Sequence, residues 1–302
     1  MKEFKSGFVG LVGRPNVGKS TLLNYILGRK VSIISPKAQT TRDVIQGVYT
    51  TDNEQIIFID TPGIHKPKHE LGKYMNEISL ATFDSVDVLL YIVDASEEFG
   101  RGDEFVIELL KKCETKCILV VNKIDLITDK ASFEENISKF TNAYEFNDVL
   151  YISATLGDNV DKLLDVIKDN LEPGPMYYPK DQISDHSESF LLAEIIREKV
   201  ILLTKEEVPH SVAVFIENKQ VDEDNPLLIN INAVIIVERP SQKKIIIGSG
   251  GTMIKEIGTS ARKELVMVLG KKVYLELFVK VIEDWRNRPS ELKKLGYYID
   301  RM

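Results

Sequence analysis

The sequence predicts an α/β fold, in which a mostly parallel sheet carries helices on both faces, followed by an α+β unit. In the first half, apolar runs alternate with helical stretches, and these runs end at Val12, Ile59, Val93, Val121 and Ile152. This alternation is typical of consecutive βαβ units. After residue 186 the predicted order becomes helix, strand, strand, helix, glycine-rich turn, helix, strand, which indicates a second domain of different architecture.

A proline-rich segment separates the two predicted domains. Residues 173–185 begin with Pro-Gly-Pro-Met-Tyr-Tyr-Pro-Lys. Just before this segment, apolar residues at helical spacing predict a closing helix, namely Val160, Leu163, Leu164, Ile167 and Leu171. We therefore predict a first domain over residues 1–172, a linker over 173–185 and a second domain over 186–302.

Composition and charge restrict the class of protein. Of the 302 residues, 43% are hydrophobic, and no apolar run approaches membrane-spanning length. The N-terminus has no apolar signal core, so we expect a cytoplasmic protein. The net charge of −7 argues against a protein coated in nucleic acid. From residue 239 onward, however, 14 Lys and Arg outnumber 7 Asp and Glu, which predicts one localised anionic partner.

Residues 13–20, GRPNVGKS, follow an apolar run and precede a helical stretch. Their two glycines allow backbone N–H groups to turn toward bound phosphates, with the positive end of the next helix beneath them. Lys19 can reach the β- and γ-phosphates, and the Ser20 hydroxyl can bind Mg2+. The alternative is a glycine-rich turn without a ligand, but the order of strand, loop and helix favours phosphate binding. The predicted phosphate contacts are Gly13, Asn16, Val17, Gly18, Lys19, Ser20 and Thr21.

The motif Asp-Thr-Pro-Gly at residues 60–63 follows another strand-like run. We expect Asp60 to hold Mg2+ through a water molecule and the Gly63 N–H to meet the γ-phosphate. Taken alone, this motif is as often an ordinary turn. Its place between a phosphate loop and a base-binding motif favours a nucleotide site.

Asn122-Lys123-Ile124-Asp125 follows the next apolar run and predicts guanine as the base. The Asp125 carboxylate can accept from both N1–H and the 2-amino group of guanine, whereas adenine offers no such pair of donors. Adenine would leave the anion unpaired, at a cost of about 1–3 kcal/mol. Asn122 can brace the loop and face the purine, and the stem of Lys123 can cover the base. Ser153 and Ala154, at the end of the following strand, can offer backbone N–H groups to guanine O6.

In the second domain, Gly248-Ser249-Gly250-Gly251 lies between two predicted helices and forms a GxxG turn. Such a turn lets a nucleic-acid backbone approach closely, because no side chain intervenes. Isoleucines on either side predict a floor for splayed bases, namely Ile245, Ile247, Ile254 and Ile257. A plain glycine-rich connection is the alternative; the flanking basic residues favour RNA. The predicted RNA contacts are Lys243, Lys244, Ile247, Gly248, Ser249, Gly250, Gly251, Ile254, Lys255 and Arg262.

In their order, these residues resemble the Era family of bacterial GTPases, in which a Ras-like P-loop GTPase domain precedes a type II KH domain. The resemblance runs nearly end to end. It rests on GRPNVGKSTLLN, AQTTRD at residues 38–43, DTPGIH, NKID, the Ser-Ala pair, the GxxG turn with its flanks, and Trp285-Arg286. It implies GTP, GDP and Mg2+ as ligands. It also implies binding to the 3′ end of 16S ribosomal RNA, near its CCUCC segment, in late assembly of the small ribosomal subunit.

The resemblance also implies roles for single residues. Residues 39–43 would form the first switch, in which a threonine binds Mg2+ only when the γ-phosphate is present. Thr41 is favoured over Thr40 because it directly precedes Arg-Asp. Asn16 matches a position that helps to hold K+ in some related GTPases, and bracing of the loop is the alternative. The implied catalytic set is Asn16, Lys19, Thr41 and Gly63, and the implied metal set is Ser20, Thr41 and Asp60.

Two positions depart from the wider pattern. Many KH turns carry a basic residue between their glycines, whereas this chain has Ser249 and Gly250. Ile64 follows the DTPG motif, where Ras-type enzymes carry a glutamine that orients the attacking water. An isoleucine cannot do this, so we expect slow hydrolysis unless another group places the water.

These expectations together describe a monomeric, GTP-hydrolysing switch whose nucleotide state controls access to RNA. One alternative is a signalling GTPase whose second domain docks a protein. Another is a GTPase held peripherally at the cytoplasmic face of a membrane, through contact of the basic segment with anionic lipid. An ATP-dependent kinase is the weakest alternative, because NKID argues against adenine.

Overall fold

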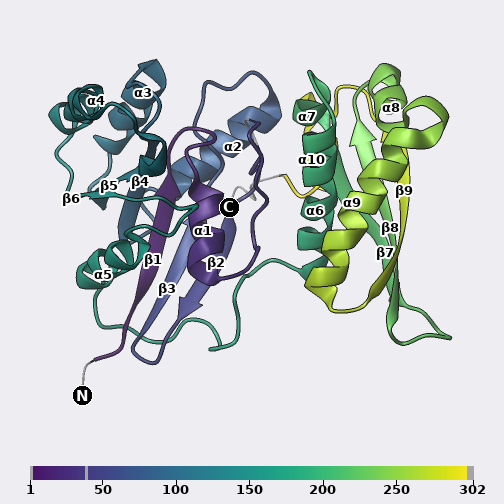
Figure 1. The fold of residues 1–302 in the computed structure, drawn as a ribbon, viewed down its shortest axis with the longest axis horizontal. Helices are drawn as coiled ribbons and strands as arrows, with labels where there is room; N and C mark the ends of the chain where they lie inside the picture. Colours follow the sequence, from purple (N-terminus) through teal and green to yellow (C-terminus); the bar gives the residue numbers. More distant parts are fainter. Residues whose placement is uncertain (1–2, 38–39, 298–302) are drawn as a thin grey trace. The chain divides into compact units, whose positions relative to one another are not determined.

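A computed structural model describes residues 3–37 and 40–297. These residues form two compact units, each with its own sheet (Figure 1). Of these residues, the first unit contains 3–32, 41–68 and 72–185, and the second contains 33–37, 40, 69–71 and 186–297. None of the described helices is long and apolar enough to cross a membrane.

The first unit is built on a six-stranded sheet in the order β2-β3-β1-β4-β5-β6. Its strands are β1 (Lys5–Val12), β2 (Ile45–Thr50), β3 (Glu54–Asp60), β4 (Val88–Asp94), β5 (Lys116–Asn122) and β6 (Asp148–Tyr151). All pairs are parallel except β2 with β3. Every residue of β4 is buried, because strands of a parallel sheet are covered on both faces. The predicted mostly parallel sheet is confirmed, and β2 is an antiparallel edge strand that the sequence analysis did not find.

Five helices and one short 3-10 helix connect these strands and cover the sheet (Figure 1). They are α1 (Lys19–Leu27), α2 (Glu70–Ala81), α3 (Arg101–Leu110), η1 (Ile124–Leu126), α4 (Lys130–Ala143) and α5 (Val160–Asn170). In α5 the residues buried are those at the predicted helical spacing, with Val160 and Ile167 at most 1% exposed. The loops after β1, β3 and β5 carry the three nucleotide-binding motifs to one edge of the sheet, where open α/β sheets bind ligands.

Residues 173–185, predicted as a linker, lie along the first unit. Pro173 forms a bridge with Lys5, and Ser184 forms one with Gly47. The side chain of the buried Gln55 accepts from the backbone N–H groups of Tyr177 and Tyr178, at 2.7 and 3.0 Å. This segment is therefore held to β1, β2 and β3 by specific hydrogen bonds.

The second unit has a three-stranded sheet in the order β7-β8-β9. Its elements are α6 (Glu188–Leu203), α7 (Val208–Ser211), β7 (Ala213–Val221), β8 (Leu228–Val237), α8 (Pro240–Ile247), η2 (Ser249–Gly251), α9 (Thr252–Leu269), β9 (Lys272–Val281), η3 (Trp285–Asn287) and α10 (Pro289–Lys294). Strand β7 pairs antiparallel with β8, and β8 pairs parallel with β9. The predicted order of helices and strands is confirmed, and the structure adds the one-turn helix α7 before β7 and the short helices η3 and α10 after β9.

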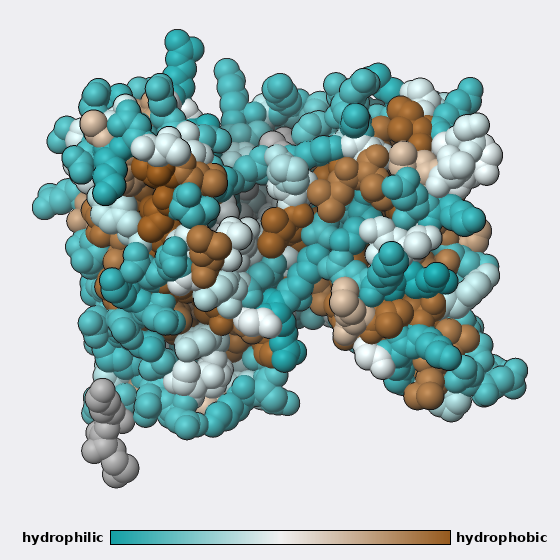
Figure 2. Space-filling model, in the orientation of Figure 1, coloured by the Kyte–Doolittle hydropathy of each residue, from teal (hydrophilic) through white to brown (hydrophobic). Residues whose placement is uncertain are grey.

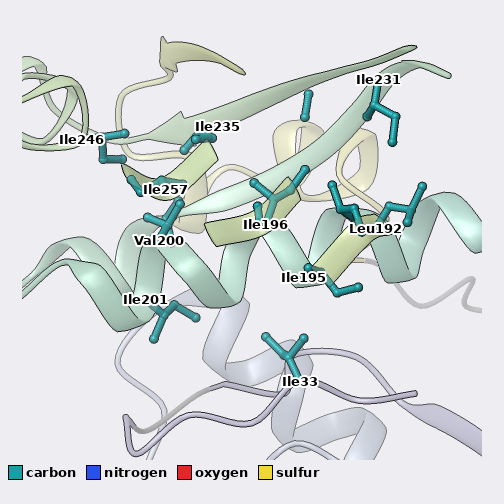
Figure 3. Close-up of a cluster of buried hydrophobic side chains, with 14 of the residues drawn as sticks. Ile33, Leu192, Ile195, Ile196, Val200, Ile201, Ile231, Ile235, Ile246 and Ile257 are labelled. Carbon is teal, nitrogen blue, oxygen red and sulfur yellow. The ribbon is translucent and has the colours of Figure 1, made fainter. Parts of the chain in front are cut away.

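One hydrophobic cluster holds this second sheet to its helices (Figure 3). Helix α6 contributes Ile196 and Val200, β8 contributes Ile231 and Ile235, and all four are 0% exposed. Ile33, from the segment 33–40, packs against the same cluster at 1% exposure. Thr40, the first described residue of the predicted first switch, is grouped with this second unit as well.

Candidate nucleotide site and RNA groove

The phosphate loop joins β1 to α1, and its two glycines adopt backbone angles that other residues rarely take. Gly13 has φ +151° and Gly18 has φ +102°. A Cβ on Gly13 would lie 2.3 Å from the carbonyl oxygen of Ile92, and one on Gly18 would lie 2.1 Å from Nδ2 of Asn122. Both positions therefore require glycine for space as well as for conformation.

The Lys19 ammonium group is buried inside this loop. Its Nζ donates to the carbonyl oxygens of Gly13 and Arg14, at 3.2 and 2.9 Å. Burial lowers the pKa of Lys19 from 10.5 to about 8, partly opposed by the charge of Asp60. A bound polyphosphate would supply the missing negative charge and raise this pKa again.

Three oxygen-bearing side chains of the first unit meet at the start of α1. Ser20 Oγ donates to Asp60 Oδ2 at 2.6 Å and lies 3.0 Å from Thr41 Oγ1. The other carboxylate oxygen, Asp60 Oδ1, is buried and has no hydrogen-bond partner among the described residues. Burial also raises the pKa of Asp60. An unpaired buried carboxylate oxygen beside two hydroxyl groups is the ligand chemistry that Mg2+ prefers, so these residues fit a magnesium ion.

The two switch threonines differ in what they contact. The Thr41 hydroxyl lies at this cluster, whereas the Thr40 hydroxyl donates to the carbonyl oxygen of Lys37 at 2.6 Å. Gln39, also placed in the switch by the sequence analysis, lies outside the described residues. Ser32, which the sequence analysis missed, donates to Asp60 Oδ2 at 3.1 Å and is 1% exposed. Its only sequence signal is its position shortly after α1.

The DTPG loop packs tightly against the phosphate loop. A Cβ on Gly63 would lie 2.6 Å from the backbone nitrogen of Pro15, and the Ile64 N–H donates to the Gly13 carbonyl at 3.1 Å. The Ile64 side chain is 2% exposed and belongs to the hydrophobic core of this unit. It is therefore directed into the core, as its apolar chemistry requires.

The base-binding motif is organised around Asn122, which joins three loops. Its Nδ2 donates to the Val17 carbonyl at 2.8 Å, and its Oδ1 accepts from the Ala154 N–H at 2.9 Å. Lys123 forms an ion pair with Asp94. Asp125 lies in η1 with its side chain exposed, so its carboxylate is accessible to a base.

The backbone N–H groups that we expected to contact guanine O6 have other partners in this structure. The Ser153 N–H donates to the Asp158 carbonyl at 3.1 Å, and the Ala154 N–H is used by Asn122. Both donors that we expected to face guanine O6 are thus engaged within the protein. For Ala154 the reason is Asn122, which ties the segment after β6 to the phosphate loop. For Ser153 it is the bridge that this residue forms with Asp158.

A further contact of the phosphate loop was also missed. Arg14 forms ion pairs with Asp103 and Glu97, each at 2.9 Å. Asp103 is 2% exposed and accepts a second hydrogen bond, at 3.1 Å, from the Tyr91 hydroxyl. Burial with this carboxylate raises the pKa of Tyr91. The network anchors the loop to the first turn of α3, which is far from it in sequence.

In the second unit the GxxG turn links α8 to α9 and presents bare backbone. Gly248, Gly250 and Gly251 all have positive φ, at +75°, +59° and +81°. A Cβ on Gly250 or Gly251 would meet no described atom within 4 Å, whereas one on Gly248 would lie 2.7 Å from the backbone nitrogen of Met253. The tip of the turn is therefore open, and its base is tightly packed.

A groove of about 400 Å3 runs beside this turn, between α9 and β9. It is lined by Ile254, Lys255, Gly258, Thr259, Arg262, Leu275 and Leu277. Three predicted RNA contacts therefore share one groove. The other four lining residues, which the sequence analysis did not predict, are Gly258, Thr259, Leu275 and Leu277. Ile247 is half-buried at the end of α8, and Lys244 is exposed. The prediction that Ile257 floors the groove is wrong, because this residue points into the hydrophobic core and is 0% exposed.

Comparisons with known proteins agree with this architecture. Residues 8–123 match the family described as 50S ribosome-binding GTPase, and residues 207–286 match the KH domain. The chain is 45% identical to an Era protein solved in complex with MgGDPNP and nucleotides 1506–1542 of 16S ribosomal RNA, with a TM-score of 0.94 and coverage of 98% of this chain and 100% of that one. It is 44% identical to a variant of Aquifex aeolicus Era bound to GDP and AlF4−, with a TM-score of 0.93 and the same coverage.

Both Era structures thus match this chain over nearly its whole length. The sequence identity is well above the level at which a match indicates only a shared fold. The motifs for phosphate and guanine and the GxxG turn occupy the positions described above. This chain belongs to the Era family of GTPases, with a Ras-like GTPase domain followed by a KH domain.

Proposed function

We propose that this protein is a GTP-hydrolysing switch that binds the 3′ end of 16S ribosomal RNA and acts in late assembly of the small ribosomal subunit. The observation that carries the proposal is the presence of an oxygen-lined phosphate loop and an open GxxG groove in one chain. Support for the RNA comes from the related Era protein solved with that region of 16S RNA.

In the proposed reaction, water attacks the γ-phosphate of GTP in line with the departing GDP, and no covalent intermediate forms. Lys19 neutralises charge on the β- and γ-phosphates, and the Gly63 N–H donates to the γ-phosphate. Ser20, Thr41 and Asp60 would hold Mg2+, which supplies further positive charge to the phosphates. The other phosphate contacts are the loop N–H groups from Gly13 to Thr21, and Asp125 selects guanine while Asn122 and Lys123 position it.

Because Ile64 is buried, the attacking water must be placed by another group. Asn16 lies exposed in the phosphate loop with φ +66°. We propose that it helps to hold K+ beside the phosphates, or else braces the loop. Hydrolysis rates measured in K+ and in Na+, with Asn16→Ala as the comparison, separate these roles. A K+ stimulation that disappears in the variant supports the ion.

For RNA, the proposed contacts are the backbone of the GxxG turn and the basic residues around it. Lys243, Lys244, Lys255 and Arg262 supply charge to phosphates, and Ile247 and Ile254 contact the bases. Ser249 and Gly250 add no charge between the glycines, so backbone N–H groups carry more of the phosphate contact than in KH turns with a basic residue there.

The test is the fluorescence anisotropy of a labelled RNA containing the 3′-terminal CCUCC region, compared with a scrambled RNA, in GDP and in a non-hydrolysable GTP analogue. Gly250→Asp places a negative charge at the open tip, where the structure has room for it. Asn142→Asp adds the same charge on the exposed face of α4 and serves as the control. We expect binding that depends on RNA sequence, strengthens with the GTP analogue and fails only in Gly250→Asp. Equal binding of both RNAs would contradict the proposal.

The proposal places the protein in the cytoplasm as a monomer, with any membrane contact peripheral. Hydrophobic residues on the surface seen in Figure 2 are interrupted by hydrophilic ones, which does not favour a membrane-inserted face. Sedimentation with vesicles containing anionic lipid tests the membrane contact, and light scattering at several concentrations tests the monomer.

A further inference from the structure

The sheet of the second unit has one covered face and one open face. Alternate residues of β8 and β9, such as Ile235 and Val279, pack into the hydrophobic cluster with α6 and α9 (Figures 1 and 3). Because side chains alternate along a strand, the residues between them lie on the opposite face. Those residues form the surface that we call the open face.

Two phenylalanines lie on this open face, one on each side of the central strand β8. Phe215 of β7 pairs with Val234 of β8, which in turn pairs with Phe278 of β9. Phe215 is 36% exposed and Phe278 is 50% exposed, whereas Val234 between them is 6% exposed. The row Phe215–Val234–Phe278 is therefore a flat apolar strip with an aromatic ring at each side.

The charges on the two sides of this strip, along the strands, are unequal. The next pair toward the end of β9 is Ile236 with Lys280, and Lys280 is exposed. In the other direction Tyr274 donates to Glu276 at 3.0 Å, and Asn230 donates to Asp222, in the turn between β7 and β8, at 2.9 Å. A polyanion would therefore contact the strip on its Lys280 side, where the cation is two residues along β9 from Phe278.

The strip is continuous with the proposed RNA groove through a single strand. Leu275 and Leu277 of β9 line the groove, and Phe278, the next residue, lies on the open face. Strand β9 is also the edge of the sheet, so no further strand blocks the passage from one face to the other. A chain that fills the groove thus has to cross only the edge of β9 to reach Phe278.

Aromatic rings on an exposed sheet, beside basic residues, are a recurrent platform for single-stranded nucleic acid. A KH groove clamps about four nucleotides, so a longer RNA has bases outside it. We propose that single-stranded RNA leaving the groove crosses the edge of β9, and that its flanking bases stack on Phe278 and Phe215. This inference rests on the proposed RNA-binding function and extends it by a second contact surface.

The test uses a ten-nucleotide RNA from the 3′-terminal region of 16S RNA, with 2-aminopurine placed in turn at each position. Stacking on an aromatic ring quenches 2-aminopurine fluorescence, so the probe reports the environment of one base. The full-length protein is compared with Phe278→Ala and with Phe278→Trp, which keeps an aromatic surface. Met267→Ala is the matched control, because Met267 is 75% exposed and lies on α9, away from the open face.

We expect quenching at one or more positions outside the four-nucleotide groove segment, lost in Phe278→Ala and retained in Phe278→Trp and Met267→Ala. Loss of one stacked base should weaken binding roughly 5- to 100-fold, while probes inside the groove keep their signal. Quenching outside the groove that survives when Phe215→Ala and Phe278→Ala are combined in one chain would overturn the inference, as would its absence in the unmodified protein. If the ten-nucleotide RNA does not bind at all, the proposed function itself fails. Circular dichroism confirms that each variant is folded.

Discussion

In the nucleotide site several polar side chains, such as Lys19 and Asn122, are buried and hydrogen-bonded within the protein, whereas around the GxxG turn a basic side chain such as Lys244 is exposed. Lys19 and Asn122 are at most 6% exposed. Lys19 has two hydrogen bonds within the phosphate loop, and Asn122 has one hydrogen bond to each of two other loops. Around the GxxG turn, Lys244 is exposed and Gly250 faces open space. A preorganised buried site selects one ligand by fixed geometry, whereas an open groove binds a flexible polymer through many weak contacts.

The clearest comparison of the two sites is between a glycine of the phosphate loop and a glycine of the GxxG turn. Gly13→Ala should destabilise the first unit by roughly 3 kcal/mol, because its Cβ would collide with the Ile92 carbonyl in a strained backbone conformation. Gly250→Ala should cost only about 1 kcal/mol, since the space is open and the conformation is left-handed. Chemical denaturation followed by circular dichroism measures both, and equal losses would remove the distinction between the sites.

Substitution in the guanine-binding motif should have the next largest effect, on the affinity for nucleotide. Asp125→Asn should weaken GTP binding about 5- to 150-fold and favour xanthosine nucleotides, because an amide cannot accept from both guanine donors and leaves one unpaired. Calorimetric titration with GDP and with xanthosine diphosphate measures the change. Asp148→Asn, an exposed carboxylate at the start of β6, is the control. Unchanged GTP affinity would contradict the assignment of guanine.

The buried lysine predicts a pH dependence for the nucleotide site. In the free protein the pKa of Lys19 is about 8, and bound phosphates must raise it, so nucleotide binding takes up a proton above that pH. GDP affinity should therefore fall as pH rises above about 8, by up to tenfold per pH unit. Calorimetry in two buffers of different ionisation enthalpy detects the proton directly. A proton uptake of zero at pH 9 would show that Lys19 is fully charged before binding.

Substitution of a single residue should have its smallest effect on ligand affinity in the RNA groove. Lys255→Ala is expected to weaken binding of all RNAs alike and to reduce the slope of log affinity against log salt by about 0.7, the value for one phosphate contact on a single strand. Lys139→Ala, a lysine of α4 with a side chain 48% exposed, is the control. A change in sequence preference in Lys255→Ala would indicate contact with a base instead of a phosphate.

The parts of the site that sequence reasoning predicted are those with local causes. A phosphate loop needs glycine at fixed positions because its backbone angles are unusual, and this requirement acts within eight residues. The alternation of apolar runs predicted the parallel sheet for a similar reason, since each strand and helix carries its own periodicity. The order of motifs then indicated the edge of the sheet at which they would meet.

The parts that were missed depend on residues brought together from distant positions. Ser32 reaches Asp60, and Arg14 reaches Asp103 across 89 residues. The edge strand β2 was missed because it carries Gly47 and alternates with polar residues. Ile257 was placed in the groove because helical spacing alone cannot tell which of two nearby isoleucines faces the core.

By itself, the sequence determined the class of ligand at each end of this protein: phosphates and guanine for the first unit, and a polyanion for the second. It could do so because each ligand is recognised by a short motif, whose residues are close together in the sequence and contact the ligand together. The tertiary structure decided which donors are already used, as at Ala154, and which side of β9 faces the groove. Those outcomes depend on packing between elements far apart in the chain. Several polar groups can compete for one hydrogen-bond partner, and several apolar side chains for one buried position, and only folding decides between them.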